Sequence, residues 1–256
     1  MAFQRYVAIG DSSTEGLDDP HGDGRFRGWA DRLAMHVAQQ QGGLLYANLA
    51  VRGRRTREIL EQQLEPALAM RPDLATVFSG TNDVIRSGFD AATVAADIEA
   101  MQRALRGAGA TVLTFTLPDL SDVIPLARRA SARVLTLNAM LRDISGRTGT
   151  ILVDLAEHPV ARDPRLWSED RLHANSEGHS RIAAALAHAL GVDGFDERWA
   201  MPLPPRPSVP FPTRAAVELR WVRRYLLPWV WRHARGRSSG DGISAKRPIL
   251  SPVELQ

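Results

Sequence analysis

The sequence predicts an α/β protein in which a parallel sheet is covered by helices on both faces. Short β-like runs alternate with helical stretches as far as residue 190, and alternating strands and helices are joined by crossover connections into parallel sheets. Of the 256 residues, 44% are hydrophobic and 24% are charged, which is the balance of an ordinary globular protein. This length allows one large domain and an appendage.

Five segments have the short length and the apolar content of strands. They are 3–10, 44–50, 73–80, 111–117 and 150–155. Helices are expected between and after them, where start and stop signals occur. The expected helices are 56–70 with Thr56 as N-cap, 90–107 with Asp90 as N-cap, 131–145 before Gly146, and 176–190.

The composition changes near residue 200, where a domain boundary is expected. Residues 1–200 hold the whole alternating pattern and are predicted to form the main domain. Six prolines fall within 202–212, and proline lacks the amide donor that helices and central strands need, so 201–212 is predicted to be a stiff linker. Residues 235–256 begin with an Arg-, Ser- and Gly-rich stretch and are expected to be a disordered tail.

Residues 213–234 are predicted to form a basic amphipathic helix, broken or kinked at Pro228. Arginines lie on one face of it and apolar residues on another. These are Arg220, Arg223 and Arg224 on the first face, and Val217, Trp221, Val222 and Tyr225 on the second. Two interpretations stay open. The helix docks on the main domain, or it makes peripheral contact with an anionic membrane, where indole rings beside arginines are favourable.

Charge and residue content exclude several classes of function. Residues 201–256 hold 10 Lys and Arg against 3 Asp and Glu, whereas residues 1–200 hold 22 against 26, so nucleic-acid binding is not expected of the main domain. The absence of cysteine excludes disulfides and thiolate chemistry. No signal peptide and no apolar run of about 18 residues is evident. A cytoplasmic protein is therefore expected, with the membrane surface as the alternative.

Polar residues follow the predicted strands, where ligands bind in open parallel sheets. Asp11 and Ser12 follow the first strand, and Asp170 and His173 precede the last helix. A serine nucleophile needs a base within hydrogen-bond reach and a third group that orients the base. Side chains three residues apart in a helical turn share one face. The sequence therefore predicts a triad of Ser12, His173 and Asp170.

The same strand ends offer donors for an oxyanion hole. A carbonyl under attack develops a negative oxygen, which is stabilised by hydrogen-bond donors aimed at it. The backbone amides of Ser12 and Gly53 and the side chain of Asn82 can converge from three neighbouring strand ends. Asp11 and Asp83 are assigned supporting roles, because buried carboxylates that cap turns are common.

Four blocks of sequence resemble those of the SGNH hydrolases, also called GDSL esterases and lipases. In chain order, the nucleophile, glycine, asparagine and Asp-x-x-His blocks are GDSSTEG at 10–16, NLAVRG at 48–53, GTND at 80–83 and DRLHANSEGH at 170–179. The resemblance implies a three-layer α/β/α sandwich with a five-stranded parallel sheet. It also implies the family's four roles for Ser12, Gly53, Asn82 and His173, with Asp170 orienting His173. Ser13 stands where the family often has leucine, and no long insertion that would form a lid is present.

The sequence thus predicts a serine esterase that hydrolyses small-molecule acyl esters through an acyl-enzyme on Ser12. No cofactor and no metal ion are expected. Thioester hydrolysis and acyl transfer stay open. The alternative is a catalytically silent adaptor that binds membrane or a partner through 213–234. Residues Gly236 to Gly240 fit the Gly-x-Ser-x-Gly pattern of another hydrolase fold, but they follow no predicted strand and are interpreted as linker.

Overall fold

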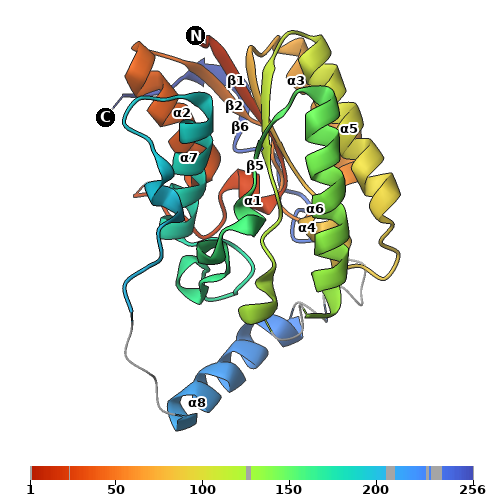
Figure 1. Cartoon of the computed structure of the whole chain (residues 1–256), viewed down its shortest axis with the longest axis vertical. Helices are drawn as coiled ribbons and strands as arrows, with labels where there is room; N and C mark the ends of the chain where they lie inside the picture. Colours follow the sequence, from red (N-terminus) through yellow and green to blue (C-terminus); the bar gives the residue numbers. More distant parts are fainter. Residues whose placement is uncertain are drawn as a thin grey trace.

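The computed structural model describes residues 2–22, 24–124, 128–205, 211–228, 231 and 238–255. Its centre is a six-stranded sheet in the order β5-β4-β3-β1-β2-β6 (Figure 1). Five of the strands pair in parallel: β1 (Arg5–Gly10), β2 (Leu45–Asn48), β3 (Leu74–Phe78), β4 (Thr111–Phe115) and β5 (Ile151–Val153). Each lies within one of the five predicted strand segments. The predicted α/β class is therefore confirmed.

Helices cover both faces of the sheet, which confirms the three-layer sandwich (Figure 1). One face carries α2 (Gly28–Gln41) and α7 (Ser176–Leu190), and the other carries α3 (Thr56–Ala69), α5 (Ala91–Gly107) and α6 (Arg128–Thr148). The remaining short elements lie mostly at the carboxyl ends of the strands. They are α1 (Ser12–Glu15), α4 (Thr81–Val84), η1 (Leu120–Asp122), η3 (Leu155–Glu157), η4 (Pro159–Arg162), η5 (Pro164–Leu166) and η6 (Glu197–Ala200).

Local signals set most of the helix ends. Asp90 caps α5 as predicted, because its carboxylate accepts hydrogen bonds from the amides of residues 92 and 93. Thr56 is not a cap: α3 has Arg55 at its N-cap position, and the Thr56 amide and hydroxyl both bind Asp83 instead. Helix α6 runs past Gly146, and α2 was not among the predicted helices.

The sixth strand, β6 (Arg247–Pro252), corrects two expectations. The sheet has six strands and not five, and the part of 235–256 that the structure describes is not wholly disordered. Strand β6 pairs antiparallel with β2. Without β6, β2 would be the edge strand of the sheet, with unpaired backbone amides and carbonyls. Leu250 and Val253 pack against the core, and the Arg247 guanidinium lies 5.2 Å from the centre of the Tyr46 ring. Two prolines obscure the strand in the sequence, although an edge strand tolerates them.

The predicted basic helix begins slightly earlier than expected. Helix α8 (Phe211–Trp221) continues through a π-helical turn, Val222–Leu226, and lies beyond the carboxyl ends of the strands (Figure 1). Residues 206–210 of the predicted linker, and 229–230 and 232–237 of the helix and tail, lie outside the described residues. Within the described parts of the chain, no helix combines the length and the apolar character needed to cross a membrane.

Candidate active site

The end of β1 places Ser12 at the first position of α1, at the carboxyl edge of the sheet. Gln63 on α3 binds both backbone groups of Gly10, accepting from its amide at 2.8 Å and donating to its carbonyl at 2.9 Å. A Cβ atom at Gly10 would lie 2.2 Å from Thr14 Oγ1, so only glycine fits there. Asp11 then caps α1 through the amide of Ser13. The strand end and the first turn of α1 are thereby held together.

The structure brings Ser12, His173 and Asp170 within hydrogen-bond distance, although 161 positions separate the first two. Ser12 Oγ lies 2.8 Å from His173 Nε2, and His173 Nδ1 lies 2.6 Å from Asp170 Oδ2. The other Asp170 oxygen accepts from the amides of Leu172 and His173 at 2.9 and 3.0 Å. The side chains of His173 and Asp170 are 14% and 22% exposed and Ser12 is half-buried, so the serine and the base remain reachable from solvent.

The two partners shift each other's pKa in opposite directions. Burial alone would raise the pKa of the Asp170 carboxyl, but the hydrogen bond with His173 and the imidazolium charge hold it well below its ordinary value. Burial alone would lower the pKa of His173, but the hydrogen bond and charge of Asp170, followed by the charges of Asp18 and Asp11, raise it above 6.5. Asp170 therefore stays ionised and stabilises a protonated His173.

A second carboxylate, Asp18, lies beside the pair. Ser168 Oγ is 2.6 Å from both Asp18 Oδ2 and Asp170 Oδ1, and Asp18 Oδ2 is 3.9 Å from His173 Nδ1. Asp18, Asp170 and His173 also form a group whose ligand atoms lie within 4.8 Å of one another. In a triad, however, Nδ1 carries a hydrogen and donates it in a hydrogen bond to Asp170, and the same atom would not then bind a metal ion.

The loop that carries Gly53 is tied to α1 by a partly buried ion pair. Glu15 is 4% exposed and accepts hydrogen bonds from the Arg52 amide at 2.7 Å and from the Arg52 guanidinium. Gly53 has φ +76°, and a Cβ atom there would lie 2.3 Å from Ser238 Oγ in the C-terminal segment. The Gly-x-Ser-x-Gly segment therefore packs on the glycine block, at least over Ser238 to Gly240, and is not free linker there.

Asn82 reaches the site, but its side-chain amide already has two acceptors. Asn82 Nδ2 donates to Asp11 Oδ2 at 3.1 Å and to the Arg54 carbonyl at 2.9 Å. Asp11 is 1% exposed, and burial raises its pKa to about 7. An oxyanion would therefore compete with Asp11 for one Asn82 hydrogen, and the competition is weaker when Asp11 is neutral.

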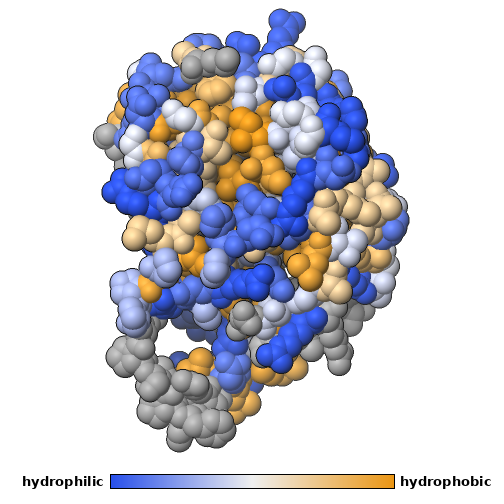
Figure 2. Space-filling view, in the orientation of Figure 1, coloured by the Kyte–Doolittle hydropathy of each residue, from blue (hydrophilic) through white to orange (hydrophobic). Residues whose placement is uncertain are grey.

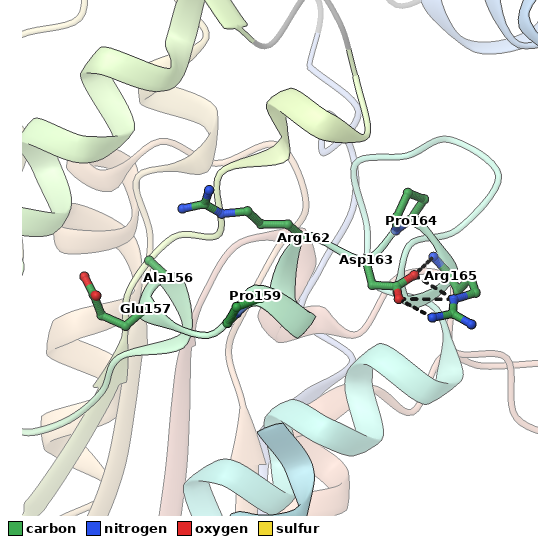
Figure 3. Close-up of a pocket in the computed structure, with 7 residues that line it drawn as sticks. All are labelled: Ala156, Glu157, Pro159, Arg162, Asp163, Pro164 and Arg165. Atoms are coloured by element: carbon green, nitrogen blue, oxygen red, sulfur yellow. Dashed lines mark hydrogen bonds and ion pairs between the residues drawn. The ribbon is translucent and has the colours of Figure 1, made fainter. Parts of the chain in front are cut away.

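A separate hollow of about 750 Å³ lies along the segment that precedes Asp170 (Figure 3). It is lined by Ala156, Glu157, Pro159, Arg162, Asp163, Pro164 and Arg165. Asp163 and Arg165 pair with each other at one side of it, and Arg162 extends away from them (Figure 3). None of the predicted site residues lines this hollow.

The fold and the order of the four blocks place the chain among the SGNH-type hydrolases. It belongs to the GDSL-like Lipase/Acylhydrolase family, whose profile matches residues 8–181. Membership of this family supports ester hydrolysis as the general class of reaction. No curated protein matches the chain.

Solved structures with the same fold include three hydrolases of low sequence identity. The lipase/acylhydrolase from Enterococcus faecalis is 20% identical, with a TM-score of 0.60 over 73% of this chain and 95% of that one. The acetylxylan esterase Axe2 from Geobacillus stearothermophilus is 16% identical, with a TM-score of 0.64 over 76% of this chain and 97% of that one. The esterase EstA from Pseudoalteromonas sp. is 18% identical, with a TM-score of 0.58 over 73% and 97%.

Sequence reasoning missed several residues that shape the site. Glu15 lies inside the nucleophile block and Arg52 inside the glycine block. Their opposite charges could have indicated an ion pair between these two blocks. Asp18 and Ser168 had no local signal, because only the tertiary structure brings them beside Asp170. Trp221 was assigned to the apolar face of a helix, but its contact was not predictable from that face.

Proposed function

We propose that the protein is a serine esterase in which Ser12, His173 and Asp170 form a catalytic triad. The observation that carries this proposal is the unbroken hydrogen-bond chain from Ser12 Oγ through both imidazole nitrogens of His173 to Asp170, at 2.8 and 2.6 Å. The partly buried, ionised Asp170 fixes the tautomer in which Nε2 is free to accept a proton.

The proposed reaction forms and then breaks an acyl-enzyme. Ser12 Oγ attacks the ester carbonyl while His173 Nε2 takes the hydroxyl proton, and the carbonyl oxygen becomes an oxyanion. The amides of Ser12 and Gly53 and the side chain of Asn82 stabilise that oxygen. His173 returns the proton to the departing alcohol, and water then repeats the sequence to release the acid. Because the base must be neutral, activity falls as the pH drops through the raised pKa of His173.

Ser12→Ala tests this proposal against a matched neighbour, Ser13→Ala. The hydroxyl of Ser13 accepts a hydrogen bond from the Trp29 indole at 3.3 Å, so it serves as a control for loss of a hydroxyl in the same turn. Fluorophosphonate labelling should disappear in Ser12→Ala and persist in Ser13→Ala. Turnover of short-chain nitrophenyl esters should fall by about 10⁶ without Ser12, and similarly in His173→Ala.

Labelling that persists in Ser12→Ala would overturn the assignment of the nucleophile. If the wild-type chain itself is neither labelled nor active, the adaptor interpretation takes its place. A panel of nitrophenyl esters of increasing chain length, with a thioester and an acetylated sugar beside it, then identifies the acyl group and the leaving group.

We also propose that the outward face of α8 and of the π-helical turn that continues it contacts anionic membrane. This face comprises Leu219, Arg220, Arg223 and Leu227. Leu219 and Leu227 are 62% and 56% exposed, and both arginines are exposed. Apolar and hydrophilic atoms lie side by side on this part of the surface (Figure 2). Apolar side chains interleaved with arginines suit the interface of an anionic lipid layer.

Sedimentation with vesicles tests the membrane contact. Full-length protein should pellet with phosphatidylserine-containing vesicles but not with pure phosphatidylcholine, and added salt should weaken the binding. Replacing Arg220 and Arg223 by Gln should abolish it, whereas replacing Arg103 and Arg198, two exposed arginines of the main domain, should not. Equal behaviour with both kinds of vesicle would refute the contact.

A further inference from the structure

One face of α8 lies against the loop that carries Asp170, near the foot of the view in Figure 1. Glu218, Trp221 and Tyr225 follow one another at intervals of three and four residues, which places them on the same side of a helix. All three contact residues of the loop. Trp221 is 8% exposed, so the contact excludes water at its centre.

The central contact is made to the backbone of Asp170 itself. Trp221 Nε1 donates a hydrogen bond to the Asp170 carbonyl at 3.2 Å. The Arg171 guanidinium lies 4.7 Å from the centre of the Trp221 ring, within the range of a cation–π contact. Glu218 accepts two hydrogen bonds from the same guanidinium, at 2.8 and 2.6 Å. This paired geometry is the stronger form of an Arg–carboxylate contact.

The contacts continue on the other side of Asp170. Tyr225, in the π-helical turn that continues α8, donates to Glu169 Oε2 at 2.8 Å, so α8 and this turn together hold three consecutive residues of the loop. Arg171 has φ +65°, a left-handed conformation that costs energy for a residue with a Cβ atom. The ion pair with Glu218 and the stacking on Trp221 offset part of that cost.

We propose that α8 positions Asp170, the carboxylate of the triad, with Trp221 as the main positioning residue; this inference rests on the proposed triad. The amides of Leu172 and His173 hold the Asp170 carboxylate from inside the loop. Trp221 holds the carbonyl of the same residue from outside. With both ends of Asp170 held, its Oδ2 keeps its place 2.6 Å from His173 Nδ1. The appendage therefore takes part in catalysis without touching substrate.

Trp221→Phe tests this role because it removes the N–H donor and keeps an aromatic ring, although a smaller one, beneath Arg171. Trp199→Phe is the matched control: its indole nitrogen is buried and has no hydrogen-bond partner among the described residues. The assay is hydrolysis of a soluble nitrophenyl ester across pH. We expect Trp221→Phe to lower kcat by about 10- to 100-fold with little change in KM, while Trp199→Phe stays within about twofold of wild type.

The pH profile separates positioning from a loss of folded protein. A loosened Asp170 raises the pKa of His173 less, so the acid limb of kcat/KM should move to lower pH in Trp221→Phe. A smaller fraction of folded protein would lower kcat/KM by the same factor at every pH and would leave the position of the acid limb unchanged. A lower kcat with an unmoved limb, or no change at all, would overturn the proposal. Should Trp221→Phe fail to fold, Glu218→Gln carries the same test, because its side chain is 53% exposed.

Ser12→Ala, run beside these variants, keeps the two proposals apart. If Ser12→Ala abolishes fluorophosphonate labelling and Trp221→Phe leaves the profile unchanged, only the positioning role fails. If Ser12→Ala is still labelled, the proposed triad fails first.

Discussion

His179 is predicted to make the protein acid-sensitive within a defined pH window. It is fully buried, its Nδ1 accepts from the Trp29 amide at 3.1 Å, and its Nε2 donates to the Leu17 carbonyl at 2.9 Å. Protonation of His179 would add a hydrogen to Nδ1, which would then face the Trp29 N–H and could no longer accept its hydrogen bond. Burial lowers the pKa of His179 from 6.5 to about 4, with the Leu17 hydrogen bond acting in the opposite direction.

The sign and size of the effect follow from that pKa. Because the folded state binds the proton less tightly than the unfolded state, the stabilisation is complete above about pH 6.5 and is lost progressively towards pH 4. At about 1.4 kcal/mol for each factor of ten in proton affinity, the loss amounts to about 3 kcal/mol. The Asp170 carboxyl, whose pKa is lowered, contributes its own loss only below the ordinary carboxyl range.

Urea unfolding between pH 7.5 and 4.5, followed by tryptophan fluorescence, measures this loss. His179→Gln should be less stable at neutral pH, yet its free energy of unfolding should fall by about 3 kcal/mol less than that of wild type across the window. Other groups also titrate in this pH range, so the effect of His179 is measured as the difference in pH dependence between wild type and His179→Gln. His21→Gln, at an exposed histidine, should follow wild type. Equal slopes for His179→Gln and wild type would refute the reasoning.

Three further outcomes are expected. Asn82→Ala should lower kcat by about 10²- to 10³-fold with KM less affected; a change mainly in KM in steady-state kinetics would instead make Asn82 a substrate-binding or structural residue. Asp11→Asn removes a charge that raises the pKa of His173, so the acid limb of the pH–rate profile should move to lower pH, and an unmoved limb would contradict that coupling. Deleting 247–256 exposes the edge of β2 and the core contacts of Leu250 and Val253, and should cost roughly 2–4 kcal/mol in urea unfolding; unchanged stability would mean that the tail is separable.

Local patterns in the sequence were sufficient to predict the parallel sheet and to recognise the four sequence blocks of the family. Strand segments and helix caps such as Asp90 depend on neighbours only a few residues away. Glycine and short polar residues at strand ends also follow from local chain geometry, and parallel strands bring their carboxyl ends to one edge. Ser12 and His173 could therefore be assigned to one site although they are distant in the chain.

The tertiary structure alone decided what surrounds those residues and where the C-terminal segment goes. Strand β6 pairs with β2, which lies far away in the chain, and its prolines are tolerated only because it lies at an edge. In the sequence, Trp221 is one apolar residue of a predicted amphipathic helix. Its hydrogen bond to the Asp170 carbonyl depends on where that helix docks. The engagement of Asn82 by Asp11 likewise depends on two strand ends meeting. Such contacts are non-local, since the partner that satisfies a buried donor or an unpaired edge is determined by packing and not by neighbouring residues in the chain.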